Sequence, residues 1–154
     1  MIYFTKKIDY GLELMVELAQ HFPGRPLSLK KIARQRKLSL KFIEQVASTL
    51  RKRGLIGAKE GRVGGYFLTK SPGKISLWQI IKTLEGEARL CDDCLRNDAC
   101  YPKGIWHEFE RIFIEKSKKL TLKEIYLKKG GEKNDEYASA KTIWQGNFFF
   151  KRNF

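Results

Sequence analysis

A chain of 154 residues and 18.0 kDa has room for one domain with an appendage, which excludes a large multidomain enzyme. Hydrophobic residues make up 42% of the chain and aromatic residues 12%, too many for a wholly disordered protein. The formal net charge of +14 favours a polyanionic partner, and residues 28–70 concentrate that charge with 12 basic and 2 acidic side chains.

The N-terminal stretch carries four charged residues between positions 6 and 13, where a signal peptide would need an unbroken apolar core. No stretch of the sequence approaches the roughly 18 apolar residues that a membrane span requires. We therefore expect a soluble, cytoplasmic protein. Thiols stay reduced in that compartment, so we do not expect the cysteines to form disulfides.

The first predicted element is an amphipathic helix from Thr5 to about Phe22. Its apolar residues recur at helical spacing, and its acidic residues form a neighbouring stripe. A segment with two prolines and a glycine at 23–26 then breaks the helical pattern.

Two short helices follow and predict a helix-turn-helix. Ser28 is placed to cap a helix through about Gln35, and Ser39 to cap a helix that Gly54 ends. A tight turn at 36–38 joins the two helices. In the second of them the apolar residues follow the i, i+3, i+4, i+7 pattern of a buried face: Ile43, Val46, Ala47 and Leu50.

A predicted β-hairpin comes next. Its strands are residues 55–59 and 65–69, around a glycine-bearing loop with basic residues, which is typical of the wing of a winged helix. Ser76 and Gln79 then form a capping box that begins a fourth helix, and Gly86 ends it.

The helix that Ser39 caps presents polar side chains of the lengths and donor types that suit phosphates and base edges. The candidate DNA-binding residues on this helix, on the wing and at the two helix starts are Ser28, Ser39, Lys41, Glu44, Gln45, Ser48, Lys52, Lys59 and Arg62. The plain alternative is a charged face that is only solvated. The charge nevertheless lies on the elements that would touch a duplex, and this favours DNA binding.

Three cysteines lie in residues 87–101, which show no regular period and are predicted to form an exposed loop. The spacing Cys91-x-x-Cys94-x5-Cys100 lets three thiolates converge on an iron–sulfur cluster or a zinc ion. His107 is the candidate fourth ligand of a zinc site, although we favour an ordinary polar role on a helix for it. The alternative for the cysteines is a set of inert thiols.

A long helix is predicted from Pro102, because proline suits the first turn and apolar residues follow at helical spacing. These apolar residues cover more than one narrow face, so the helix needs two partners, one of which we expect to be its copy in a second subunit. Thr121 with Glu124 is a capping box for a short helix to about Leu127. The charged, glycine-bearing run that follows has the composition of a linker.

The motifs appear in the order SLKKIARQRKLSLKFIEQVASTLRKRGLI, EGRVGGYFLTK, ISLWQIIKTLEG, three loop cysteines, GIWHEFE and LTLKEI. In content and order they closely resemble the Rrf2 family of winged-helix regulators, which includes IscR, NsrR and RirA. The resemblance covers about residues 1–127. It implies a homodimeric bacterial transcription regulator whose long helix crosses to the partner subunit. It also implies an iron–sulfur cluster on the loop cysteines, whose gain, loss, oxidation or reaction with nitric oxide changes DNA affinity.

The resemblance also bears on the fourth ligand. In IscR a histidine three residues after the third cysteine completes the site, and Lys103 stands there in this chain. In NsrR-like members the ligand is an aspartate on the first helix of the other subunit, and Asp9 matches that place. Asp9 is therefore the candidate fourth ligand, and its alternative role is a solvated acid aligned with Glu13 and Glu17. In the wing, Glu60 stands where the family often has an arginine. An acidic side chain there would repel phosphates, so we assign the minor-groove contact to Arg62 instead.

The sequence thus predicts a mainly α fold with a small β-hairpin. Its regions are a winged helix-turn-helix domain (1–86), a cysteine loop (87–101), a dimerisation helix with a short following helix (102–127), and a flexible or docked tail (128–154). The predicted function is that of a dimeric, non-enzymatic regulator that binds a palindromic DNA operator and is controlled by an iron–sulfur cluster. A 2Fe–2S cluster is favoured over a 4Fe–4S cluster. The alternatives are a DNA-binding regulator with structural zinc or direct thiol sensing and, more remotely, a thiol redox enzyme or electron carrier.

Overall fold

The computed structural model describes residues 5–86 and 103–131. The elements are α1 (Lys6–Gln20), α2 (Leu29–Arg36), α3 (Leu40–Lys52), β1 (Ile56–Lys59), β2 (Gly65–Leu68), the 3-10 helix η1 (Pro72–Lys74), α4 (Leu77–Glu85), α5 (Lys103–Lys119) and α6 (Leu122–Gly131). The predicted fold class, mainly helical with one antiparallel hairpin, is confirmed. No helix in the described ranges is both long and apolar enough to span a membrane.

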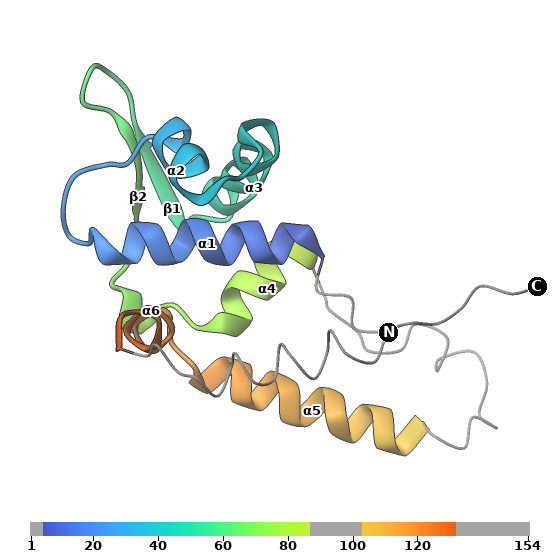
Figure 1. Ribbon diagram of the computed structural model, residues 1–154. Helices are drawn as coiled ribbons and strands as arrows, with labels where there is room; N and C mark the ends of the chain where they lie inside the picture. The colour runs from blue at the N-terminus through green and yellow to red at the C-terminus, as the bar shows by residue number, and fades with distance from the viewer. Residues whose placement is uncertain (1–4, 87–102, 132–154) are drawn as a thin grey trace, which may run out of the picture.

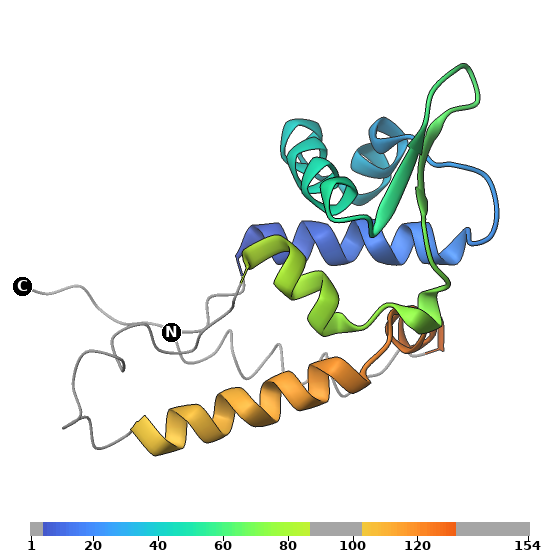
Figure 2. The ribbon, with the colours of Figure 1, turned by 180° about the vertical axis from the view of Figure 1, so that it is seen from behind.

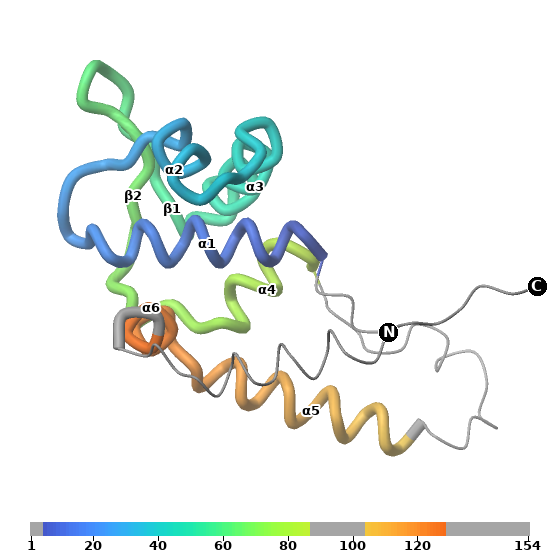
Figure 3. Tube along the Cα trace, in the orientation of Figure 1, coloured from blue at the N-terminus to red at the C-terminus, as the bar shows by residue number. Residues whose placement is uncertain are grey.

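Helix α1 runs through the middle of the molecule. The helices α2 and α3 and the β-hairpin lie on one side of it, and α4 and α6 lie on the other (Figure 1). From behind, α4 lies between α1 and α5 (Figure 2). The trace in Figure 3 passes from the end of α5 directly into α6, which packs beside η1. The long helix therefore lies on the far side of α1 from the helix-turn-helix.

The central position of α1 decides which of its residues are buried. Because α2, α3, α4, α6 and β2 all contact α1, this helix buries more than the single stripe that its apolar spacing predicts. Leu14 and Met15 are fully buried, and even Glu17 is only 7% exposed. Fully burying an aliphatic side chain of this size stabilises a fold by about 1.5–3 kcal/mol. Helix α1 is thus the element around which the rest of the domain packs.

The helix-turn-helix forms where its local signals place it. Ser39 caps α3, since its hydroxyl accepts a hydrogen bond from the backbone N–H of Phe42 at 3.4 Å. Ser28 holds the equivalent position before α2 but makes no side-chain capping bond. Between the helices, Lys37 takes a left-handed conformation with a φ of 55°, which ends α2 and turns the chain towards α3.

The hairpin pairs Ile56 with Leu68 and Lys59 with Gly65, as the predicted strands require. Leu27, just before α2, extends the pairing. Its N–H donates to the carbonyl of Tyr66 at 2.9 Å, and the N–H of Tyr66 donates to the carbonyl of Leu27 at 2.8 Å. The base of the wing is therefore tied to the segment that leads into the helix-turn-helix.

The predicted end of the last helix is wrong. Helix α6 continues to Gly131 instead of ending near Leu127, so the first residues assigned to a linker are helical. Its start is as predicted. The backbone N–H and hydroxyl of Thr121 both donate to Glu124, and they lower the pKa of its carboxyl group. Leu122 is fully buried in the core, which fixes this helix to the body.

Candidate nucleic-acid interface

Helix α3 has one buried and one exposed face. Its apolar residues Ile43, Val46, Ala47 and Leu50 are at most 1% exposed. All of its candidate DNA-binding residues are exposed: Lys41, Glu44, Gln45, Ser48 and Lys52. The core therefore fixes the helix by one face, and a set of donors and acceptors remains free to meet a duplex on the other.

Helix α2 adds a group of basic side chains that the sequence reasoning did not single out. Lys30, Lys31 and Arg34 are all exposed, while the other face of α2 is buried. In a helix-turn-helix the first helix crosses the DNA backbone, so these cations are placed to meet phosphates. The signal was present in the sequence, as three basic residues at the positions between the apolar ones.

The wing presents the remaining candidates. Lys59 and Arg62 are exposed, as is Glu60 between them, and Val63 is 71% exposed. The wing projects from the same side of α1 as α2 and α3 (Figure 1). Ser28 and Ser39 are also exposed, at the starts of α2 and α3. All nine candidate DNA-binding residues are thus accessible, on elements that share one side of the molecule.

An ion pair fastens the helix-turn-helix to α1. The Nη2 and Nε atoms of Arg36, at the end of α2, donate to Oε2 of Glu17 at 2.6 and 3.1 Å. The hydrogen bond with Glu17 raises the pKa of Arg36, burial opposes this rise, and the charges of Glu17 and Glu13 add to it. The alternative that places Asp9 in a solvated acidic stripe therefore does not extend to Glu17, because Glu17 is buried and Arg36 of α2 pairs with its carboxylate.

A second contact reaches α3 from α1. The backbone N–H of Ser39 donates to the hydroxyl of Tyr10 at 3.2 Å. The rings of Tyr10 and Phe42 meet edge to face, with centroids 4.8 Å apart and an interplanar angle of 84°. Such aromatic pairs add about 0.5–1.5 kcal/mol beyond the area they bury. Helix α1 thus contacts both sides of the turn between α2 and α3.

The predicted metal ligands Cys91, Cys94 and Cys100 lie outside the described residues. Asp9 is exposed on α1, where it lines a groove with Leu12, Glu13, Val16 and Ile125 of α6. Within residues 5–86 and 103–131 no three histidine, cysteine, aspartate or glutamate side chains are grouped to hold a metal. A site that included Asp9 would therefore depend on the cysteines.

Helix α4 ends beside the start of α1. The Thr5 hydroxyl donates to Glu85, and the Lys7 ammonium donates to the carbonyl of Leu84. The chain therefore leaves α4 towards the cysteine segment from a point next to the first turn of α1.

His107, the candidate zinc ligand, is exposed on α5. Its Nδ1 lies 3.8 Å from a carboxylate oxygen of Glu110, an arrangement typical of an ordinary surface histidine.

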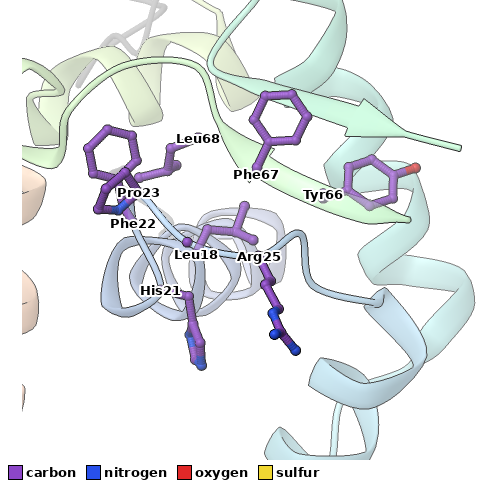
Figure 4. Close-up of a pocket in the computed structure, with 9 residues that line it drawn as sticks. Leu18, His21, Phe22, Pro23, Arg25, Tyr66, Phe67 and Leu68 are labelled. Carbon is purple, nitrogen blue, oxygen red and sulfur yellow. The ribbon is translucent and has the colours of Figure 1, made fainter. Parts of the chain in front are cut away.

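A small cavity lies between the end of α1 and β2 (Figure 4). Its volume is about 100 Å³, whereas ligand pockets run to roughly 300–1,000 Å³. The side chains of His21 and Arg25 point away from the rings of Phe22 and Phe67 (Figure 4). The Nδ1 atom of His21 lies 3.0 Å from the carbonyl oxygen of Glu17. This cavity is too small for a cofactor.

Helix α5 carries an apolar stripe that is exposed. Ile105, Trp106, Phe109 and Ile112 are 60%, 47%, 61% and 46% exposed. Their spacing places them along one side of the helix. Scattered apolar residues are common on a protein surface, but a contiguous stripe of this kind marks an interaction site.

Comparisons with known proteins agree with this geometry. Residues 4–128 match the model of a family described as Rrf2, iron-dependent transcriptional regulator. The chain is 30% identical over 130 residues to the transcriptional regulator NsrR of Shouchella clausii, which covers 80% of this chain and 87% of the relative. The structure of CymR, the global cysteine regulator of B. subtilis, has a TM-score of 0.73 and 32% identity and covers 82% of this chain and 97% of its own. IscR of T. potens has a TM-score of 0.72 and 30% identity over 89% of this chain and 96% of its own.

Proposed function

The chain belongs to the Rrf2 family of DNA-binding transcriptional regulators, and from this premise we propose that it is a homodimer that reads a palindromic operator under the control of an iron–sulfur cluster. The observation that carries the proposal is the face of α3. Its core side is fully buried, and its polar side is exposed beside a basic helix and a basic wing. This arrangement suits insertion of α3 into the major groove and of the wing into the adjacent minor groove.

Each group of side chains has its own part in DNA recognition. Lys41, Glu44 and Gln45 lie in the first half of α3, from which a recognition helix contacts base edges. Lys52 at the end of α3 and the cations of α2 are placed for phosphates, which contribute affinity but little sequence information. Arg62 on the wing is placed for the minor groove, where a narrow groove attracts cations.

The operator can be found by selection from a random-sequence duplex library with the full-length chain. We expect enrichment of a palindrome whose half-sites lie about one or two helical turns apart. Gln45→Ala should weaken binding to this selected duplex by roughly fivefold to a hundredfold and relax base preference at one position per half-site. Lys52→Gln should weaken binding to the selected and to mixed-sequence duplexes alike, measured by fluorescence anisotropy.

The matched control is Lys123→Gln, because Lys123 is exposed on α6, on the far side of α1 from α3. This variant removes the same charge as Lys52→Gln and should bind the selected duplex like the parent chain. A library that yields no enriched sequence, or a Gln45→Ala chain with unchanged specificity, would contradict the assignment of α3.

The proposed metal centre has three thiolates and one carboxylate as its donors: Cys91, Cys94, Cys100 and Asp9. Thiolates select iron–sulfur clusters or zinc over magnesium or calcium. The carboxylate of Asp9 is exposed, as a ligand supplied to another subunit must be. A bound 2Fe–2S or 4Fe–4S cluster would supply a redox- and iron-dependent state, and the DNA-binding residues would respond through the position of α1.

Removal of the three cysteines tests this centre. We expect protein purified without air to be coloured and to contain matching iron and sulfide, and Cys91→Ala/Cys94→Ala/Cys100→Ala to contain neither. The loaded and triple-variant chains should differ in affinity for the selected duplex by at least about fivefold, the lower end of usual allosteric couplings. Equal affinities would overturn the proposed switch while leaving DNA binding intact.

The metal analysis also separates the other readings of the cysteines. Colourless protein with one zinc ion per chain would favour a structural zinc site. Colourless protein without metal would favour direct thiol sensing. The similarity of this chain to CymR, a cysteine regulator, supports that alternative. A thiol enzyme is the remotest alternative, because the regulators that this chain resembles are named for transcription, and a basic wing serves no such chemistry.

A further inference from the structure

Two of the helices close their N-terminal caps locally. At α4 the hydroxyl of Ser76 accepts from the N–H of Gln79 at 3.2 Å, and the side chain of Gln79 accepts from the N–H of Ser76 at 3.0 Å. At α6, Thr121 and Glu124 make the same reciprocal pair, at 3.3 and 2.7 Å. In both cases the residue three positions after the cap supplies the second acceptor, so neither cap needs a tertiary contact.

The cap of α3 cannot be closed in this way. Ser39 caps the helix, but the residue three positions later is Phe42, whose side chain has no acceptor. The N–H of Ser39 donates instead to the hydroxyl of Tyr10, 29 residues earlier in the chain, at 3.2 Å. The contact between the Tyr10 and Phe42 rings holds that hydroxyl in place. The second half of the capping box at α3 is therefore supplied by α1.

The helix whose cap depends on a distant residue, α3, is also the helix whose start must be placed most accurately. The first turn of α3 carries Lys41, followed by Glu44 and Gln45, and base contacts tolerate only small displacements of the side chains that make them. We propose that Tyr10 is a positioning residue for DNA recognition, which acts through the backbone of Ser39 to fix the start of α3. The inference rests on α3 being the recognition helix of the proposed function.

The same geometry makes the start of α3 sensitive to α1. Tyr10 holds the start of α3, and Glu17 holds the end of α2 through Arg36, so both tethers on the helix-turn-helix originate from one helix. Asp9 immediately precedes Tyr10 in the first turns of α1. A displacement of α1 would therefore alter the cap of α3 directly, without unfolding either helix.

Tyr10→Phe tests the proposal, since it keeps the ring against Phe42 and removes only the acceptor. Hydrogen exchange of the Ser39 amide, followed by NMR, should become about threefold to tenfold faster, as expected for the loss of one net hydrogen bond. Affinity for the selected duplex should fall by a similar factor, and affinity for a mixed-sequence duplex by less than about twofold. Tyr126→Phe is the matched control, because Tyr126 is half-buried on α6 and its hydroxyl makes no hydrogen bond to the described residues.

A second variant separates the cap from general stability. Glutamine at position 42 would supply the local acceptor that Gln79 supplies in α4, whereas leucine there removes the same ring without supplying an acceptor. In a Tyr10→Phe chain, Phe42→Gln should therefore slow Ser39 exchange and Phe42→Leu should not. Equal Ser39 exchange in these two double variants, or unchanged Ser39 exchange in Tyr10→Phe alone, would overturn the role of Tyr10. If the parent chain selects no duplex, the proposed function fails, and the role of Tyr10 in recognition fails with it. If the parent chain selects a duplex and Tyr10→Phe changes neither Ser39 exchange nor affinity for that duplex, only the inference about Tyr10 fails.

Discussion

Phe109→Glu is expected to convert the proposed dimer into a monomer and to lower affinity for the selected duplex by about a hundredfold or more. Phe109 is 61% exposed in the apolar stripe of α5. If α5 packs against its copy, the new carboxylate would be buried without a partner, which costs several kcal/mol. A monomer then meets only one half-site and loses the contribution of the second. Analytical ultracentrifugation and fluorescence anisotropy measure the two effects.

The matched control for this prediction is Lys118→Glu. Position 118 is nine residues, or about two and a half helical turns, from position 109, so the same carboxylate is placed on the opposite side of α5. This variant should remain dimeric. A Phe109→Glu chain that sediments as a dimer and binds the selected duplex normally would show that the stripe is not the subunit interface.

Gly65→Ala is expected to destabilise the domain by about 2–4 kcal/mol and to displace the wing. The φ of Gly65 is +150°, a conformation that side chains rarely adopt. A Cβ atom there would lie 2.5 Å from the carbonyl oxygen and 2.6 Å from the carbonyl carbon of Leu27, both of them backbone atoms. Relief of that clash would break the hydrogen bonds between Leu27 and Tyr66. Urea unfolding measures the loss of stability.

Gly61 provides the comparison that separates the clash from the backbone strain. It too has a positive φ, +109°, but nothing lies within 4 Å of the Cβ position. Gly61→Ala should therefore cost only about 1–2 kcal/mol, from strain alone. If both variants lose the same stability, close packing against Leu27 does not explain the need for glycine at 65. A larger loss for Gly65→Ala would show that the contact with Leu27 explains the second glycine of the GGY motif.

Local signals predicted much of the fold and most of the interface. The capping boxes at Ser76 and Thr121 and the cap at Ser39 begin helices at the predicted residues, because their partners lie within four positions of each other in the chain. The exposed face of α3 also followed from the sequence, since helical periodicity alone separates buried from exposed positions. The structure confirms the exposure of every candidate DNA-binding residue, whereas their roles remain predictions.

The errors in prediction arose where the deciding contact is distant in sequence. Periodicity placed Glu17 with the solvated acids, but Arg36 of α2 covers it. The charged composition after Leu127 suggested a linker, although α6 is anchored by Leu122 and continues to Gly131. Composition describes the average behaviour of a segment, and packing against α1 overrides that average.

The sequence by itself determined the family, the order of the elements, the caps of α4 and α6 and the polar face of α3, because each of these depends on residue types at short fixed spacings. Only the tertiary structure decided that α1 is central, that its Glu17 is buried, and that Tyr10 completes the cap of α3. The physical reason is that each depends on contacts between elements far apart in the chain. A hydrogen bond or ion pair between residues 19 or 29 positions apart forms only after the helices have packed. A local sequence pattern therefore cannot predict which residue will be the partner.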